Sequence, residues 1–149
     1  MRKALPVGVA LALLGAAQLV PVDRSNPPVE SDVAAPPEVK AILRRACYDC
    51  HSHETVYGWH TRIAPVSWLV ARDVEEGRER MNFSRWGAVG AKRLSKLRKK
   101  LPEEVAEGEM PPWSYRLAHP QARLSDADRA ALEAWGRSLG GGEARTGER

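Results

Sequence analysis

The pentapeptide Cys47-Tyr48-Asp49-Cys50-His51 constrains this chain more than any other feature of its sequence. Two cysteines three positions apart and an adjacent histidine form the C-x-x-C-H pattern of c-type haem attachment. At this spacing each thiol can form a thioether with one of the two vinyl groups of the macrocycle, and the histidine then lies beneath the iron. We therefore predict one haem c per chain, attached at Cys47 and Cys50, with His51 as the proximal iron ligand.

Other uses of a C-x-x-C pair are a dithiol redox site, a zinc site and a structural disulfide. A thioredoxin-like dithiol needs a strand before the motif and a helix after it, and no such βαβ pattern is visible. Zinc needs four ligands, and although His51, His53 and His60 could join the cysteines, the sequence has no second cysteine pair and no H-x-x-x-H. A disulfide would leave the adjacent histidine as a coincidence. Haem is therefore the first interpretation and zinc the second.

The N-terminus has the features of an export signal. Arg2 and Lys3 precede an uncharged run from Ala4 to Ala17 that ends in small residues. Apolar character continues to Val22, and a helix over residues 4–22 would span about 28 Å, close to the hydrocarbon thickness of about 30 Å. We therefore expect either a cleaved signal peptide or a single-span membrane anchor. In both cases the rest of the chain is exported to the periplasm or its equivalent, where bacteria attach haem covalently.

Length and composition fit one small domain with a segment on either side. The chain has 149 residues, of which 43% are hydrophobic. After the leader of residues 1–22, residues 23–37 are proline-rich and polar, so we expect an extended linker that holds the domain off a membrane. Residues 140–149 are glycine-rich and charged, so we expect a disordered tail. The haem-binding domain is then predicted over residues 38–139.

Hydrophobic periodicity predicts several short helices within this domain. Apolar residues at helical spacing indicate helices over 38–45 and 67–80, and a third over 94–105 whose line is disturbed at Pro102. Between the first two, glycine and proline interrupt any long element, so we expect a loop with short helical turns. No strand pattern competes with the helices.

The last predicted helix opens at Ser125. Ser125 and Asp128 form a capping-box-like start, with an aspartate in place of the usual glutamate. One face of this helix is apolar apart from Asp128, and its members are Leu124, Leu132, Trp135 and Leu139. Short helices, long loops and one haem together predict an all-α, cytochrome c-like domain whose terminal helices pack together around the cofactor.

The sixth position of the iron separates electron transfer from ligand chemistry. Met110 is the first candidate, because Pro111 and Pro112 follow it and hold the loop stiff and non-helical. It lies 59 residues after His51, far enough for the chain to reach the opposite face of the macrocycle. His119 also precedes a proline and is the alternative.

Three further side chains are weaker candidates for this position. His53 is only two residues from the proximal ligand and cannot cross the ring, while the reach of His60 is marginal. Met81 falls on a predicted amphipathic helix, where a methionine usually belongs to the core. We therefore predict Met110 as the distal ligand. Its thioether would raise the reduction potential relative to ligation by two histidines, since it favours ferrous iron.

The distribution of charge bears on the partners of the chain. The formal charge of +4 falls to +2 without Arg2 and Lys3, so nothing in it requires nucleic acid. The basic residues are unevenly placed, and a run without an intervening acid comprises Arg85, Lys92, Arg93, Lys96, Arg98, Lys99 and Lys100. Most such runs are solvated helix faces. The alternative is a docking patch for an acidic redox partner or for anionic lipid.

Several separated blocks of the sequence match a known family in order. They are Asp23-Arg24 with Asn26-Pro27-Pro28, RACYDCHSHET at 45–55, IAPVSWLVARDVEEGR at 63–78, MNFSRW at 81–86 and EGEMPPWSY at 107–115. Together they resemble the small bacterial haem-binding domain family of exported c-type cytochrome proteins. The resemblance implies covalent haem binding at Cys47 and Cys50 with His51 as axial ligand, and it favours an uncleaved anchor. It names no partner or pathway, because haem binding alone leaves function open.

These observations predict an electron carrier rather than an enzyme. A single haem that carries one electron between redox partner proteins needs no bond-making chemistry, and no catalytic residues are predicted. The alternative is a haem-based peroxidase, or a gas or redox sensor, in which the sixth position of the iron is open or its ligand is displaced.

Overall fold

The computed structural model describes residues 4–140 of the chain. Its α-helices are α1 (Ala4–Ala17), α2 (Pro37–Ala46), α3 (Tyr48–His51), α4 (Val66–Arg80), α5 (Ala91–Ala106), α6 (Trp113–Ala118) and α7 (Asp126–Ser138). Short 3-10 helices are η1 (Trp59–Arg62), η2 (Trp86–Ala88) and η3 (Pro120–Ala122). Residues 4–140 contain no β-strand, only an isolated bridge between Ser31 and Arg85. The predicted all-α class is thus confirmed, and residues 141–149 of the predicted tail lie outside the described part.

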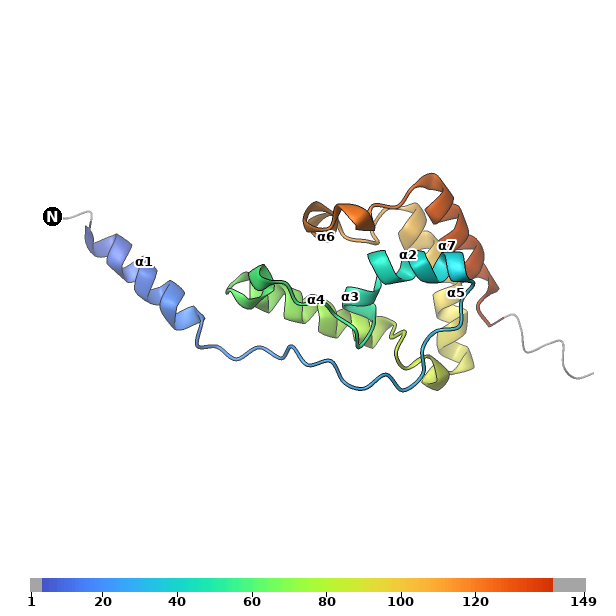
Figure 1. Ribbon diagram of the computed structural model, residues 1–149, viewed down its shortest axis with the longest axis horizontal. Helices are drawn as coiled ribbons and strands as arrows, with labels where there is room; N and C mark the ends of the chain where they lie inside the picture. Colours follow the sequence, from blue (N-terminus) through green and yellow to red (C-terminus); the bar gives the residue numbers. More distant parts are fainter. Residues whose placement is uncertain (1–3, 141–149) are drawn as a thin grey trace, which may run out of the picture.

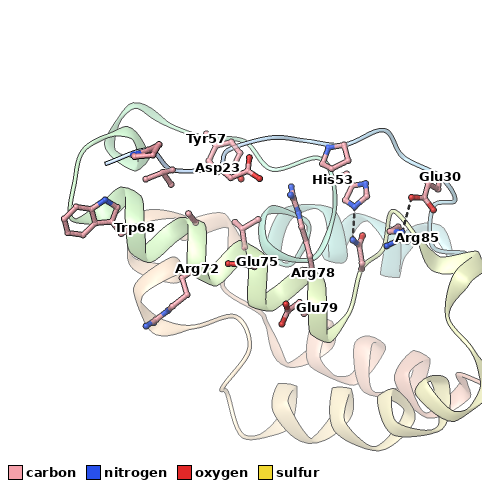
Figure 2. Close-up of a pocket in the computed structure, with 16 residues that line it drawn as sticks. Asp23, Glu30, His53, Tyr57, Trp68, Arg72, Glu75, Arg78, Glu79 and Arg85 are labelled. Atoms are coloured by element: carbon pink, nitrogen blue, oxygen red, sulfur yellow. Dashed lines mark hydrogen bonds and ion pairs between the residues drawn. The ribbon is translucent and has the colours of Figure 1, made fainter. Parts of the chain in front are cut away.

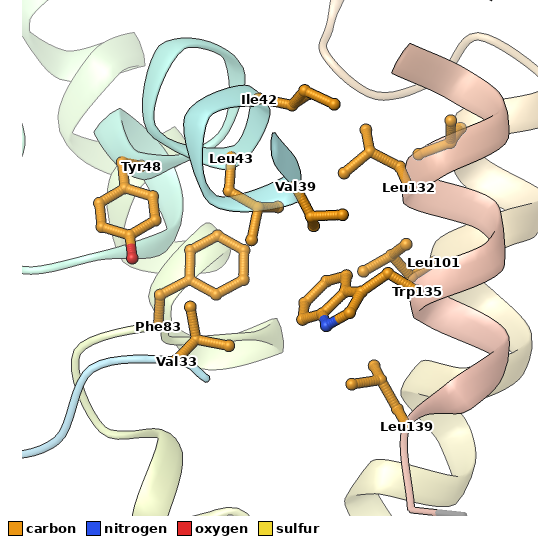
Figure 3. Packing of buried hydrophobic residues seen from close by; sticks show 11 residues of the cluster. Val33, Val39, Ile42, Leu43, Tyr48, Phe83, Leu101, Leu132, Trp135 and Leu139 are labelled. Atoms are coloured by element: carbon orange, nitrogen blue, oxygen red, sulfur yellow. The ribbon is translucent and has the colours of Figure 1, made fainter. Parts of the chain in front are cut away.

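The core lies where α2, α5 and α7 meet. α5 runs beside α7, and α2 packs against α7 in turn (Figure 1). The predicted spacing in α2 puts its apolar side chains on one buried face, and Figure 3 shows them directed at side chains from α5, α7 and the segment after α4. The buried cluster comprises Val33, Val39, Ile42, Leu43, Tyr48, Phe83, Leu101, Val105, Leu132, Trp135 and Leu139.

Helix α5 continues through Pro102, although the sequence predicts a disturbance there. A proline inside a helix removes one hydrogen bond and costs roughly 3 kcal/mol. Packing offsets this cost, because the Pro102 ring lies directly against Gly136 of α7, where an added Cβ would come within 3.0 Å of the ring. Leu101 and Val105 on either side of the proline are buried in the core. Tertiary contact with α7 therefore keeps the helix intact.

The start of α7 is formed as predicted. The backbone N–H of Asp128 donates to Ser125 Oγ, and the backbone N–H of Ser125 donates to Asp128 Oδ2 at 2.8 Å. Asp128 also pairs with Arg45 of α2, at 2.6 Å between Nη2 and Oδ2. The hydrogen bond from Arg45 lowers the pKa of the Asp128 carboxyl. The one polar residue on the apolar face of α7 thus joins this helix to the end of α2.

Helix α1 is shorter than the predicted run of residues 4–22. It ends at Ala17, and Pro21, four residues further on, has no N–H to donate to the Ala17 carbonyl. None of the helices in the described range combines the length and the apolar character needed to cross a membrane. α1 projects away from the other helices in Figure 1, and Gln18 just beyond it exchanges hydrogen bonds with both backbone groups of Ala64.

Residues 23–36, the strap, differ from the predicted linker. The strap has no helix, as the proline content suggests, but it runs along the domain instead of standing clear of it (Figure 1). Val33 is only 4% exposed and belongs to the core cluster. Arg78 of α4 holds the other end of the strap, donating to the Ser25 carbonyl and to Asn26 Oδ1. The proline-rich, polar composition of the strap does not reveal that Val33 is buried in the core.

Val33→Ala tests whether the strap belongs to the core. We expect it to lower the free energy of unfolding by about 2 kcal/mol, because it deletes two buried carbons and leaves a cavity. Val29→Ala is the matched control, since Val29 lies in the same strap and is 46% exposed. Its effect should stay within about 0.5 kcal/mol. Urea denaturation followed by circular dichroism measures both, and equal effects would contradict the burial of the strap.

Candidate functional site

The C-x-x-C-H motif forms one tight turn at the junction of α2 and α3. The backbone N–H groups of Cys50 and His51 both donate to the Cys47 carbonyl, at 3.2 and 3.0 Å. α2 delivers the chain to this turn, because its buried face fixes the helix against the core up to Ala46. Cys47 itself packs against the core cluster. The three residues predicted to bind haem therefore lie on one rigid turn.

The imidazole of His51 is oriented by the end of α4. Its Nδ1 lies 2.9 Å from the Gly77 carbonyl and 3.1 Å from the Met81 carbonyl. Carbonyl oxygens only accept, so Nδ1 carries the proton and Nε2 keeps its lone pair. Burial of the ring lowers the pKa of His51, which favours the neutral form. A neutral imidazole whose other nitrogen donates to backbone oxygen is the arrangement of a metal-ligating histidine.

Gly77 allows α3 and α4 to come this close. A Cβ built on Gly77 would lie 2.4 Å from the carbonyl oxygen of Cys50 and 3.1 Å from Cys50 Cβ. No side chain fits in this space, because the opposing atoms are backbone that is fixed by the turn. The glycine therefore brings the Gly77 carbonyl within reach of His51. The His51 main chain is held as well, because its carbonyl accepts from the Phe83 N–H at 2.7 Å.

Both motif cysteines are free thiols. Burial raises the pKa of Cys47 to about 12, and burial likewise raises the pKa of Cys50 to about 12. Both side chains are therefore neutral at physiological pH. They are half-buried, so they are held in place while part of each remains accessible.

Asp49 and Tyr115 join the motif to a distant segment. The Tyr115 hydroxyl on α6 donates to Asp49 Oδ2 at 2.7 Å, while Asp49 Oδ1 accepts from the Val56 N–H at 3.0 Å. Sequence reasoning missed both residues as parts of the site. The available signals were an acidic residue between the two cysteines and a tyrosine in the block EGEMPPWSY. Neither reveals that these two residues, 66 positions apart, are in contact.

Met110 and His119 lie on the same segment as Tyr115. Met110 is half-buried between α5 and α6, and its backbone N–H donates to the Glu104 carbonyl at 3.1 Å. His119 directly follows α6, and its ring stacks on Tyr115 with centroids 4.1 Å apart. The His60 ring is 6.5 Å from that of His119. Tyr115 connects this segment to the motif through its hydrogen bond to Asp49.

The remaining histidine and methionine near the motif have structural roles. His53 is buried, with Nδ1 2.9 Å from the Pro28 carbonyl and Nε2 2.9 Å from the Asn82 amide nitrogen. Met81 packs against the core cluster beyond the end of α4, as expected of a core methionine.

Large apolar side chains are exposed on the two segments that flank the motif. One segment runs from residue 56 to 69 and the other is α6, and the two approach each other at His60 and His119. The exposed side chains are Val56, Trp59, Ile63, Val66, Trp68, Leu69, Trp113 and Leu117. Where such side chains form a contiguous patch, they mark a ligand or interaction site. Such a patch would suit a large, flat, apolar ligand held at the motif.

A separate cavity of about 820 Å³ lies between the strap and α4. Charged residues such as Asp23, Glu75 and Arg78 belong to its lining, and Figure 2 shows Asp23 and Tyr57 opposite Glu75 and Arg78 of α4. His53 borders it, but the two cysteines and His51 are not among the lining residues. The charged wall makes this cavity a poor match for an apolar macrocycle.

An all-α fold that presents two thiols and an oriented imidazole from one turn defines a haem-binding protein. In agreement, residues 12–138 match a family model described as a haem-binding domain, and the chain belongs to this family. No curated protein and no solved structure gave a significant match.

The residues at the motif fit a haem by their own chemistry. Two neutral thiols, an imidazole whose Nδ1 is paired with backbone carbonyls, and exposed apolar side chains supply attachment, ligation and apolar contact. For zinc, the second interpretation, three or more clustered ligands are needed. No group of three or more His, Cys, Asp or Glu side chains suited to a metal ion occurs within residues 4–140.

Gly77→Ala tests the close approach of α3 and α4. We expect a loss of at least about 2 kcal/mol in unfolding free energy, because the new methyl group would overlap the Cys50 backbone. Alanine's better helix propensity, worth up to about 1 kcal/mol, is too small to offset this. Gly90→Ala is the control, since nothing lies within 4 Å of that position, and it should cost less than about 1 kcal/mol. Equal costs in thermal or urea unfolding would contradict the contact.

The thiol pKa values predict slow alkylation of the haem-free protein. With a pKa of about 12 rather than 9, the thiolate fraction at pH 8 falls by roughly three orders of magnitude, partly offset by greater nucleophilicity. We expect iodoacetamide to react about thirtyfold more slowly with folded than with urea-unfolded chain. Stability should also fall as pH rises above about 9, because only the unfolded thiols then ionise. Equal alkylation rates would show that the thiols are not protected.

Proposed function

We propose that this protein is a single-haem electron carrier of the cell envelope, with haem c attached covalently at Cys47 and Cys50. His51 is the proximal ligand in this proposal. The observation that carries it is the pair of backbone carbonyls, from Gly77 and Met81, that face His51 Nδ1 and leave Nε2 for the iron. Membership of the haem-binding domain family supports the cofactor, and the C-x-x-C-H spacing supports the covalent link.

Electron transfer suits the residues around the motif better than catalysis does. When bound, the haem supplies an iron that changes between the ferric and ferrous states. The chain's contribution is to hold the ligands and exclude water. The nearby polar side chains already have partners: Asp49 accepts from Tyr115 and Val56, and His53 contacts Pro28 and Asn82. None of them is placed as a free acid or base.

Met110 is the proposed distal ligand. Its backbone is fixed to α5 through Glu104, and Pro111 and Pro112 stiffen the chain that follows. The competing side chain, His119, is engaged in a stack with Tyr115, and its Nδ1 lies 3.2 Å from the Tyr115 carbonyl. Methionine ligation would favour ferrous iron and raise the potential.

Export and protein redox partners complete the proposal. The uncharged run after Arg2 and Lys3 supports export to the periplasm or its equivalent. On α5, Lys92, Lys96 and Lys99 follow one another at helical spacing and are all exposed. A positive face of this kind would steer an acidic partner protein toward the carrier.

The test is the spectrum of the full chain produced with export and haem maturation. We expect a c-type ferrous α-band that survives acid-acetone extraction, and its loss in Cys47→Ser/Cys50→Ser. The ferric protein should show a methionine-to-iron charge-transfer band that disappears in Met110→Ala and persists in His119→Ala. Extractable haem would refute covalent attachment. Covalent haem that lacks the band and binds carbon monoxide readily would favour the enzyme or sensor class.

A further inference from the structure

We propose that Tyr115 is a positioning residue for the sixth coordination position of the iron, acting through its hydrogen bond to Asp49. This bond, the 49–115 latch, fastens residues 107–119, the distal segment, to the C-x-x-C-H turn. The proposal rests on the proposed function, because it assigns to the latch the placement of the distal ligand on a haem held by that turn.

The latch connects two elements that are otherwise remote. Asp49 lies between the two cysteines, and Tyr115 lies on α6, 66 residues further along the chain. The phenol donates to Asp49 Oδ2 at 2.7 Å, and the other carboxylate oxygen is held by the Val56 N–H. Asp49 is therefore held by the backbone of Val56 as well as by Tyr115. Burial, and the bond to Asp49 itself, raise the pKa of Tyr115, so its hydroxyl remains a donor at physiological pH.

Two further contacts fix the distal segment and the chain just after it. Before the latch, the Met110 N–H donates to the Glu104 carbonyl at 3.1 Å, which fixes Met110 to α5. After it, Arg45 of α2 donates to the Gln121 carbonyl at 2.7 Å. Arg45 is two residues before Cys47. The contacts made by Asp49 and Arg45 therefore both come from the motif or from within two residues of it. The segment is thereby held against the turn that would hold the haem.

The chain between Met110 and Tyr115 is stiff enough to pass on this restraint. Pro111 and Pro112 fix two φ angles, and α6 begins at Trp113 directly after them. Because few free torsions separate the two residues, loss of the Tyr115 contact leaves Met110 held on one side only, by its hydrogen bond to the Glu104 carbonyl. On the other side of Tyr115, the same ring stacks on His119 and keeps that imidazole beside the α6 backbone. Tyr115 thus favours Met110 as the distal ligand and restrains His119, the alternative ligand.

The experiment compares Tyr115→Phe with Tyr57→Phe in the haem-loaded full chain. Tyr57 is a half-buried tyrosine that lines the cavity between the strap and α4, and the lining of this cavity includes neither motif cysteine nor His51. We expect Tyr115→Phe to keep its covalent haem, to weaken the methionine charge-transfer band and to bind carbon monoxide in the ferrous state at least tenfold faster. Tyr57→Phe should match the wild type in all three measurements. A wild-type rate in haem-loaded Tyr115→Phe overturns the latch.

Asp49 variants keep the test decisive if Tyr115→Phe loses its haem. Asp49→Ala removes the acceptor and should raise the carbon monoxide rate, whereas Asp49→Asn keeps a polar partner for the phenol and should stay near the wild type. Equal rates in these two variants overturn the latch. In Asp49→Ala, adding Tyr115→Phe should change nothing further, and additive effects would refute the proposed coupling. The haem content of the same samples separates this proposal from the proposed function. A wild type without covalent haem would refute the proposed function, whatever the state of the latch.

Discussion

The hydrogen bond from His51 Nδ1 to the carbonyls at the end of α4 is the interaction on which the rest of the site depends. It fixes the ring, determines which nitrogen carries the proton and leaves Nε2 for a metal. It forms only because Gly77 lets α3 lie directly on α4, where an added Cβ would meet the Cys50 backbone. The two unpaired thiols belong to the same turn, so fixing one ring also fixes both attachment points.

The surrounding fold serves to hold this turn from several directions. Phe83, which is fully buried, donates its N–H to the His51 carbonyl and stacks on Tyr48 within the motif, with ring centroids 5.1 Å apart. Trp86 continues this aromatic contact to Trp135 of α7. The core and the motif are therefore one packed unit. A flat apolar ligand would extend that unit over the exposed side chains of α6 and the loop before α4.

Local signals in the sequence predicted α2, α4 and the capped start of α7, because each depends on residues within one or two turns of helix. The strap and α5 were different: the burial of Val33 and the continuity of the helix at Pro102 are decided by side chains far away in the sequence. The same limit applies to the site. Cys47, Cys50 and His51 are visible as a spacing, whereas the carbonyls that orient His51 and the Tyr115 contact appear only when α4 and α6 are placed in space.

One covalent haem c on this turn is what we propose, and peptide-mapping mass spectrometry of the exported, denatured protein decides it, since only a covalent link survives unfolding and digestion. We expect one haem mass on the peptide that contains both Cys47 and Cys50. An unmodified peptide, from cells that attach haem to a control cytochrome, would refute covalent attachment.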